Sequence, residues 1–232
     1  MINHEQLSLF EERQVMYMPR IGIVGGGPVS EVPDLHPYHG EKMIWIGADR
    51  GNLTLINQGI IPDYAVGDFD SISEKDMKKI SDHVENIDKV PREKDKTDLE
   101  LAIDRALSLG TDSVYLFGVT GGRLDHEIIN IQLLYQLHSS GAEGAVINKG
   151  NWLELKTPGK YTIHHDFNYP YISFVPLSLN VRGLTLDGFY YPLTNKTVPF
   201  GSSLCISNQL IKKIGTFSFT DGILLLIKSR DV

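Results

Sequence analysis

The sequence predicts an α/β domain with a mostly parallel sheet and flanking helices, followed by an all-β domain. In the first part of the chain, short apolar runs alternate with longer segments whose apolar residues have helical spacing. After Asn151 this spacing disappears, and short apolar segments are separated by Gly, Pro, Asn or Asp. The 232 residues, 41% of them hydrophobic, suffice for one large domain or two smaller ones. We expect an N-terminal extension (1–18), an α/β domain (19–149) and a β-sandwich or partly open barrel (150–232).

Six apolar runs in the first part have the length of buried strands. Amphipathic segments lie between several of them, and this alternation is typical of parallel strands with helices on the faces of the sheet. The expected strands are Ile21–Val24, Met43–Ala48, Tyr64–Val66, Ile87–Val90, Ser113–Phe117 and Ala145–Asn148.

Two helices are clearly marked. The first, Asp98–Leu109, follows Thr97, which forms a capping-box pattern with Glu100. The second is Asp125–Leu137. The residues expected to face the sheet are Leu99, Ala102, Ile103, Ala106 and Leu107 in the first helix, and Ile128, Ile131 and Tyr135 in the second.

The second part of the chain is expected to contain only strands, because no helical period is present there. Its turns are predicted at the Gly, Pro, Asn and Asp residues between the apolar segments. The expected strands include Trp152–Thr157, Tyr171–Val175, Leu204–Ser207 and Gly222–Lys228.

Charge and composition argue against several classes of protein. A net charge of −7 is unlike that of a nucleic-acid binder. The longest aliphatic run, Ile223–Ile227, is far shorter than the ~20 residues of a membrane span. Residues 1–10 lack the basic and then apolar pattern of a secretory signal. The single cysteine, Cys205, cannot form an intrachain disulfide. We therefore expect a cytoplasmic protein that binds neither nucleic acid nor a membrane.

Aspartates follow four of the predicted strands, at the edge where open α/β sheets bind ligands. Each one alone also suits a turn or a helix cap. Four such positions converging on one edge favour a shared site, because carboxylate oxygens bind Mg2+ while substrate phosphates complete its coordination. In an acidic chain the cation would also separate these carboxylates from an anionic substrate. The aspartates are Asp49, Asp68, Asp70, Asp95, Asp98 and Asp125.

Two loops at strand ends have the composition of phosphate-binding loops. Gly25-Gly26-Gly27 follows the first strand and allows close approach of backbone N–H groups to an anion. Thr120-Gly121-Gly122-Arg123 adds a hydroxyl and a guanidinium after the fifth strand. An exposed salt bridge is the alternative role for Arg123. The chain contains neither a P-loop motif nor a complete Gly-x-Gly-x-x-Gly fingerprint.

These segments resemble, in order and spacing, the thiamin pyrophosphokinase family. The resemblance extends from Ile21 to the C-terminus, and the set of motifs is specific although single motifs are not. The matching segments are Ala48–Gly51, Gly59–Asp63, Gly67–Ser71, Lys96–Glu100, Thr120–His126, Phe200–Ser202 and Ile206–Asn208.

The resemblance implies a homodimer that uses ATP and Mg2+ to pyrophosphorylate thiamin, with two sites at the subunit interface. The implied metal ligands are Asp49, Asp68, Asp70 and Asp98, and the implied catalytic residues are Asp68, Asp70, Asp98 and Arg123. The implied ATP and phosphate contacts are Gly26, Asp49, Arg50, Asp95, Thr97, Thr120, Gly121, Gly122, Asp125 and His126. The implied thiamin contacts are Tyr191, which would stack on the pyrimidine ring, Ser207 and Asn208.

Two positions depart from the family pattern. Arg50 stands where the family usually has Gly, and Lys94 stands where related enzymes can carry Gln. The implied reaction is in-line attack of the thiamin hydroxyl on the β-phosphorus of ATP, with AMP leaving. Asp70 and Asp98 are both candidates for the group that accepts the hydroxyl proton.

Two other functions agree with parts of the sequence. Asp68-Phe69-Asp70-Ser71 after a strand is similar to the nucleophile motif of haloacid dehalogenase-type phosphatases, although two earlier strands precede it here. A non-catalytic nucleotide or thiamin sensor could have the same fold. Several metal-type aspartates argue against a sensor, because binding alone does not need them. Outside the resemblance, Tyr191 also suits sandwich packing, and Ser207 and Asn208 suit a turn.

Overall fold

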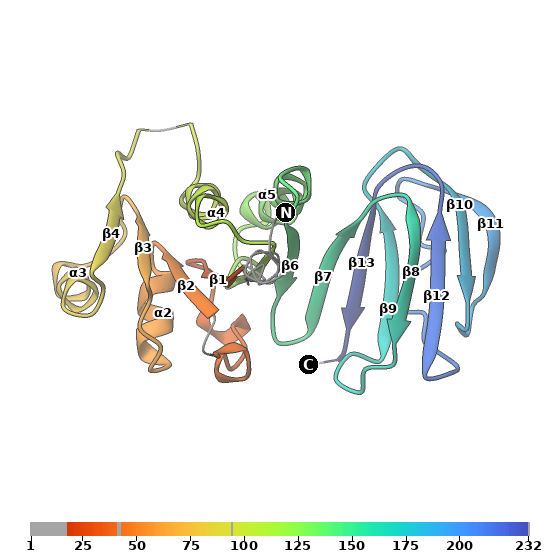
Figure 1. Ribbon diagram of the computed structural model, residues 1–232, viewed down its shortest axis with the longest axis horizontal. Helices are drawn as coiled ribbons and strands as arrows, with labels where there is room; N and C mark the ends of the chain where they lie inside the picture. The colour runs from red at the N-terminus through yellow and green to blue at the C-terminus, as the bar shows by residue number, and fades with distance from the viewer. Residues whose placement is uncertain (1–17, 41–42, 94, 232) are drawn as a thin grey trace, which may run out of the picture.

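The computed structural model describes residues 18–40, 43–93 and 95–231. The α/β half lies at one end of an elongated molecule and a β-sandwich at the other (Figure 1). Lys94 and the expected N-terminal extension, apart from Met18, lie outside the described residues. The elements are β1 (Arg20–Val24), the 3-10 segments η1 (Val29–Glu31) and η2 (His36–Tyr38), β2 (Met43–Ala48), α2 (Gly51–Asn57), β3 (Tyr64–Gly67), α3 (Glu74–Ser81), β4 (Asn86–Lys89), α4 (Asp98–Ser108), β5 (Ser113–Phe117), α5 (Leu124–Ser139), β6 (Glu143–Ile147), β7 (Asn151–Lys156), β8 (Gly159–His164), β9 (Tyr171–Pro176), β10 (Asn180–Asp187), β11 (Leu193–Pro199), β12 (Ile214–Phe219) and β13 (Leu224–Ser229).

Nine strands form sheet A in the order β4-β3-β2-β1-β5-β6-β7-β13-β9. From β4 to β6 all neighbouring strands are parallel, as predicted. After β1 the chain proceeds through β2 and β3 to β4 at the edge, and then returns to β5 on the other side of β1 (Figure 1). The strand order therefore reverses between β1 and β5, which is where open α/β sheets bind ligands.

Helices cover both faces of the parallel strands. On one face α4 and α5 bury Ile103 and Leu134 against the sheet. On the other face α2 and the 3-10 segments cover a second core that contains Leu55, Trp45 and Phe117. Two covered faces explain why these strands read as continuous apolar runs rather than as alternating patterns.

The predicted inner face is confirmed for α4, whereas in α5 it holds for Ile131, which is partly buried against the core, and is wrong for Ile128 and Tyr135. In α5, Ile128 and Tyr135 are 58% and 53% exposed, whereas the buried positions include Leu133 and Leu137. Apolar residues occur on several sides of α5, so their spacing does not select one face. The confirmed buried residues of α4 are Leu99, Ala102, Ile103 and Ala106.

The predicted sandwich forms, and one of its two sheets is the continuation of sheet A. Strand β7 is antiparallel to β6, and β13 and β9 follow in the same sheet. The second sheet, in the order β11-β10-β12-β8, faces them across a core that contains Phe174, Phe189 and Phe217. Backbone hydrogen bonds of sheet A therefore cross the expected domain boundary at residue 150.

The expected strand Leu204–Ser207 is wrong, because this segment is a turn. Cys205 is buried in the sandwich core, and its carbonyl accepts the N–H of Phe174 at 2.9 Å. Ser207 has a φ of 56°, which is outside the strand region. Cys205 therefore packs into the core from a loop, while its neighbours Leu204 and Ile206 are exposed.

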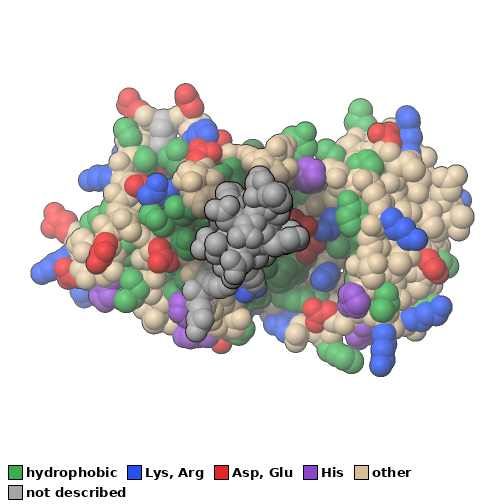
Figure 2. Space-filling model, viewed as in Figure 1, with side chains coloured by type: hydrophobic (Ala, Val, Ile, Leu, Met, Phe, Trp, Pro, Cys, Tyr) green, Lys and Arg blue, Asp and Glu red, His purple; other side chains and the backbone are tan. Residues whose placement is uncertain are grey.

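The surface is charged with both signs. On the face seen in Figure 2, Lys and Arg side chains alternate with Asp and Glu side chains over both halves of the molecule. Among the helices in the described ranges, none is long and apolar enough to cross a membrane.

Candidate active site

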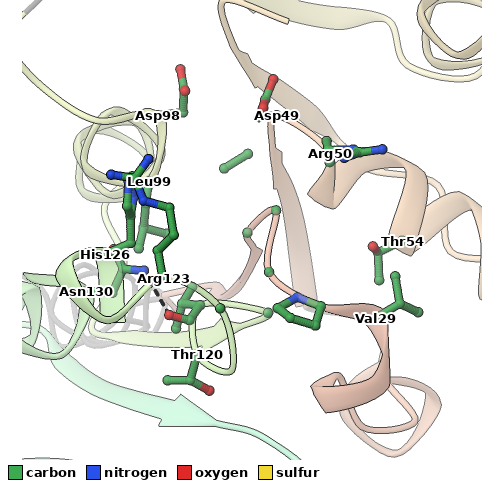
Figure 3. A pocket seen from close by; sticks show the side chains of 18 of the residues that line it. Val29, Asp49, Arg50, Thr54, Asp98, Leu99, Thr120, Arg123, His126 and Asn130 are labelled. Atoms are coloured by element: carbon green, nitrogen blue, oxygen red, sulfur yellow. Dashed lines mark hydrogen bonds between the residues drawn. The ribbon is translucent and has the colours of Figure 1, made fainter. Parts of the chain in front are cut away.

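A pocket of about 940 Å³ lies beyond the carboxyl ends of β1, β2 and β5. Asp49 and Asp98 lie at one end of it (Figure 3). Arg123 and His126 line one wall, and Arg50 lies on the opposite wall (Figure 3). Helices α2, α4 and α5 all begin at the rim, so their N-terminal backbone dipoles favour an anion in the pocket.

The glycine loop after β1 packs directly on the loop after β5. The N–H groups of Gly25 and Gly27 donate to Phe117 O and Gly118 O, both at 2.8 Å. A Cβ on Gly27 would lie 2.5 Å from Gly118 O, so a side chain cannot be placed there without displacing backbone. Gly26 lines the pocket but has only ordinary contacts at its Cβ position. Positions 25 and 27 therefore require glycine for steric reasons. At position 26 the absence of a side chain leaves the backbone open to the pocket.

Arg50 fits its position without backbone strain. Its φ and ψ are −64° and −16°, which are ordinary helical values for any residue. The Gly that the family usually has here is therefore not required by the backbone, and Arg50 adds a cationic side chain to the pocket wall.

Asp49 has an unusual backbone conformation, with a φ of 50°. Its N–H donates to Val66 O at 2.9 Å, which joins the end of β2 to β3. The side-chain amide of Asn52, the second residue of α2, donates to both Gly47 O and Asp49 O at 2.9 Å. Left-handed backbone is costly for most residues and is tolerated best by Asn and Asp among those with side chains. These bonds hold Asp49 in place at the pocket edge.

The carboxylate of Asp49 lies among other acidic groups. Burial raises its pKa, and the nearby charges of Asp98, Asp68 and Asp70 raise it further, while a hydrogen bond from Ser71 lowers it. A Cβ built on Gly67 would lie 3.4 Å from Asp49 Cα and 3.5 Å from Asp98 Oδ1, so both residues flank the end of β3. The structure thus brings together aspartates that follow three different strands.

These carboxylates do not form a preformed metal cage. Within the described ranges, no group of three or more His, Cys, Asp or Glu side chains is arranged so that it could hold a metal ion. Asp49 Oδ1 nevertheless is buried and has no hydrogen-bond partner among the described residues. A cation would neutralise both this oxygen and the repulsion between the aspartates. Mg2+ suits such a site, because it commonly binds through one or two carboxylates plus substrate phosphates.

Five of the residues predicted for catalysis, metal binding or ATP binding lie outside the pocket lining. Asp70 pairs with Arg92, with 3.1 Å between Oδ2 and Nε, and its N–H donates to Asp68 Oδ1 at 3.0 Å. Gly121 donates its N–H to Glu127 Oε1 at 2.7 Å. The residues absent from the lining are Asp68, Asp70, Asp95, Gly121 and Asp125, and those present are Gly26, Asp49, Arg50, Thr97, Asp98, Thr120, Gly122, Arg123 and His126.

Arg123 lines the pocket and is paired with Asp125. Its Nε and Nη2 donate to the two carboxylate oxygens at 3.1 and 2.5 Å. The hydrogen bond from Arg123 lowers the pKa of Asp125, which is exposed. Asp125 therefore orients the guanidinium instead of contacting the pocket itself. The salt bridge and the pocket position, which sequence reasoning treated as alternatives, are both present.

Two buried asparagines that sequence reasoning missed hold the loop after β5. Asn130, on α5, donates to Val119 O at 2.8 Å, which is the dashed bond in Figure 3. Asn148 donates to Thr120 Oγ1 at 3.0 Å. The signal for Asn130 was a polar residue about two turns into the helix that follows the Thr120–Arg123 loop. Asn148 gave no comparable signal.

The three expected thiamin residues lie in the sandwich and are absent from the pocket lining of the same chain. Tyr191 is 59% exposed and packs edge-on against Tyr190, with 4.9 Å between ring centroids. Asn208 is buried; its Oδ1 accepts the Tyr191 N–H at 3.0 Å, and its Nδ2 donates to Tyr191 O at 2.9 Å. Ser207 N–H donates to Ser173 Oγ at 2.9 Å. Asn208 thus fixes the backbone of Tyr191, and Tyr191 presents an exposed ring.

The α/β half has its pocket where the strand order reverses, with aspartates at one end and glycine loops in its wall, and it is joined to a β-sandwich. These features define the class of α/β proteins that bind a ligand at this edge of the sheet, and the glycine loops and helix N-termini suit an anionic ligand. Comparison with known proteins narrows this class. The family model "Thiamin pyrophosphokinase, catalytic domain" matches residues 35–145, and "Thiamin pyrophosphokinase, vitamin B1 binding domain" matches residues 160–224. The chain belongs to the thiamin pyrophosphokinase family, and its enzymatic class is that of a thiamin diphosphokinase.

Individual relatives agree with this assignment. The chain is 48% identical over 214 residues to a thiamine pyrophosphokinase of Bacillus subtilis (strain 168), covering 92% of this chain and 100% of that protein. A crystal structure of the Bacillus subtilis enzyme superposes with a TM-score of 0.87 at 46% identity, over 92% and 100% of the two chains. The Geobacillus thermodenitrificans enzyme gives 0.84 at 46% identity, over 91% and 97%. Yeast thiamin pyrophosphokinase, at 15% identity over 92% and 87% of the chains with a TM-score of 0.73, shares the fold.

Proposed function

We propose that this chain transfers the pyrophosphoryl group of ATP to the hydroxyl of thiamin, releasing AMP, and that it acts with Mg2+ as a homodimer in the cytoplasm. Family membership supports the reaction. The observation that carries the site assignment is that Asp49 and Asp98 lie at one end of a pocket walled by glycine loops and both flank Gly67 at the end of β3, the strand that Asp68 and Asp70 follow.

The triphosphate occupies the pocket in this proposal. Backbone around Gly26 and Gly122, the helix N-termini and the guanidinium of Arg123 offer donors and positive potential to its oxygens. Asp49, Asp68, Asp70 and Asp98 would hold Mg2+, which neutralises phosphate charge when bound. Thr97 caps α4 through its Oγ1, which accepts the N–H of Glu100 at 3.2 Å, and so keeps the start of α4 at the pocket edge.

Asp98 is the better supported proton acceptor of the two candidates. It lines the pocket as the first residue of α4. Asp70 lies outside the lining and is paired with Arg92. A carboxylate in the pocket can orient the thiamin hydroxyl for in-line attack and receive its proton as the bond to the β-phosphorus forms.

The separation of the thiamin residues from the pocket supports the homodimer. Tyr191 lies in the sandwich, and no sandwich residue occurs among the residues that line the pocket. A second copy would bring its sandwich to the pocket of the first and complete the site. Exposed apolar side chains are available on both parts for such a contact. They include Leu124, Ile128 and Ile129 at the start of α5, and Tyr190, Tyr191, Leu204 and Ile206 on the sandwich.

The activity is tested by incubating purified protein with ATP, Mg2+ and thiamin and separating the nucleotides by chromatography. AMP and thiamin diphosphate in equal amounts, both dependent on thiamin, are the expected products. ADP would indicate ordinary kinase chemistry. Phosphate release from simple phosphomonoesters without thiamin would favour the phosphatase alternative, and binding of both ligands without turnover would favour a sensor.

A further inference from the structure

We propose that Asn52 and Ser71 are positioning residues that fix Asp49 for the divalent cation of the reaction. This inference rests on the proposed function, in which Asp49 is a metal ligand. Neither residue lines the pocket. Each contacts Asp49 from a different element, Asn52 through its backbone and Ser71 through its carboxylate.

Asn52 holds the backbone of Asp49 in its left-handed conformation. Its side chain is fully buried, and its amide donates to carbonyl oxygens on both sides of the turn, Gly47 O and Asp49 O, each at 2.9 Å. Gly47 packs directly against this side chain, so that a Cβ at position 47 would collide with it. The side-chain amide of Asn52 therefore holds the turn at Asp49, whose φ is 50°, through two hydrogen bonds.

The buried amide has a cost that packing alone does not explain. Asn52 Oδ1 is buried and has no hydrogen-bond partner among the described residues. An apolar side chain of similar shape would avoid this unsatisfied oxygen, but it would leave Gly47 O and Asp49 O without the two hydrogen bonds that Asn52 donates. The side chain at position 52 therefore acts through these two bonds, and one of them holds the backbone of Asp49.

Ser71 sets the orientation of the Asp49 carboxylate. Its hydroxyl donates to Asp49 Oδ2 at 2.9 Å from the loop that follows β3. The other oxygen, Oδ1, has no hydrogen-bond partner within the described part of the chain. One oxygen is thus anchored by the protein and the other is left for a cation. Groups that hydrogen-bond a metal-binding carboxylate in this way fix its orientation and contribute to metal affinity.

The inference is tested by direct metal binding. Mn2+ is titrated into protein saturated with α,β-methylene-ATP, which resists cleavage between the α- and β-phosphates, and free Mn2+ is measured by electron paramagnetic resonance. Ser71→Ala and Asn52→Ala are each expected to raise the Mn2+ Kd about tenfold or more. The Mg2+ concentration for half-maximal AMP formation should rise in parallel, while the KM for thiamin should not change.

Leu55→Ala is the matched control, because Leu55 is fully buried on the same helix and packs in the apolar core that contains Trp45 and Phe117. It should lower Tm and leave the Mn2+ Kd unchanged. If Asn52→Ala does not fold, Ser71→Ala decides alone, since Ser71 is exposed. Parent-like Kd values in the Ser71 and Asn52 variants, with weakened binding in Asp49→Asn, overturn this inference only. A parent-like Kd in Asp49→Asn overturns the proposed cation site and the inference together.

Discussion

The acidic residues at and beside the pocket lie in different environments, and these environments suit different proposed roles. Asp49 is partly buried and hydrogen-bonded by Ser71. Asp98 is the first residue of α4, where a carboxylate interacts favourably with the helix dipole. Asp125 is occupied by Arg123. A single type of side chain thus supplies a proposed metal ligand, a proposed proton acceptor and an orienting group.

Asp98→Asn is expected to lower kcat for AMP formation roughly a hundredfold or more, because the amide cannot accept the hydroxyl proton. The helix should persist, since loss of the favourable charge–dipole interaction costs only ~0.3–1 kcal/mol. Asp104→Asn is the control: Asp104 lies on the same helix, outside the pocket lining, and accepts hydrogen bonds from Lys96 and Gln136. Equal kcat values for the two variants would remove Asp98 from the chemistry.

At the scale of elements, local chemistry at helix ends fixes the pocket. The capping box predicted at Thr97 is confirmed by the hydrogen bond to Thr97 Oγ1 from the N–H of Glu100. Thr97→Ala should destabilise the protein by about 1 kcal/mol, which for a chain of this size lowers Tm by roughly 2–4 °C. Thr97→Ser should retain the parent Tm because it keeps the capping oxygen. An unchanged Tm in Thr97→Ala would show that the cap contributes nothing to stability.

Strand β7 contains a charged pair whose effect on stability depends on pH. Burial raises the pKa of Glu154, but Lys156, at 2.6 Å, the indole N–H of Trp152 and Lys228 outweigh it, and the pKa lies below its usual value of 4.5. A lowered pKa in the folded state stabilises the protein above pH 4.5, and this contribution is lost as the pH falls through the folded-state pKa.

Glu154→Gln should therefore lower Tm at pH 7, and the difference from the parent should shrink as the pH falls below 4.5. Thermal unfolding of both proteins across this range measures the effect. Parallel Tm curves at all pH values would contradict a stabilising charge on Glu154 and indicate that only shape and hydrogen bonding matter at this position.

Elements with a strong apolar signal in the sequence could be predicted, and elements defined by their partners in the fold could not. The runs Met43–Ala48 and Ser113–Phe117 coincide with β2 and β5 because both faces of these strands are buried. Strand β11, Leu193–Pro199, carries mostly exposed polar residues and has no apolar signal. In the site, the aspartates after the strands could be predicted. Asn52, Asn130 and Asn148 could not, because their role depends on carbonyl groups that only the folded chain brings near.

The whole molecule is built on one sheet that serves two purposes. Its parallel part presents the pocket, and its antiparallel part forms one half of the sandwich (Figure 1). A continuous sheet leaves little freedom for the sandwich of one chain to fold over the pocket of the same chain. The exposed ring of Tyr191 therefore favours delivery of the second substrate by a partner subunit, as in the proposed homodimer.

Mixed dimers test this arrangement. Asp98→Asn is expected to inactivate the pocket of its own chain, and Tyr191→Ala is expected to impair the sandwich of its own chain, chiefly by raising the KM for thiamin. If each site combines the pocket of one chain with Tyr191 of its partner, a heterodimer of the two variants contains one intact site and one doubly altered site. Co-expression at equal levels should then restore about a quarter of the parent activity at low thiamin, because half of the dimers are mixed and each has one working site. Activity no greater than the mean of the two separate variants would place Tyr191 in the site of its own chain or outside any site. A monomeric mass measured by light scattering would refute the dimer itself.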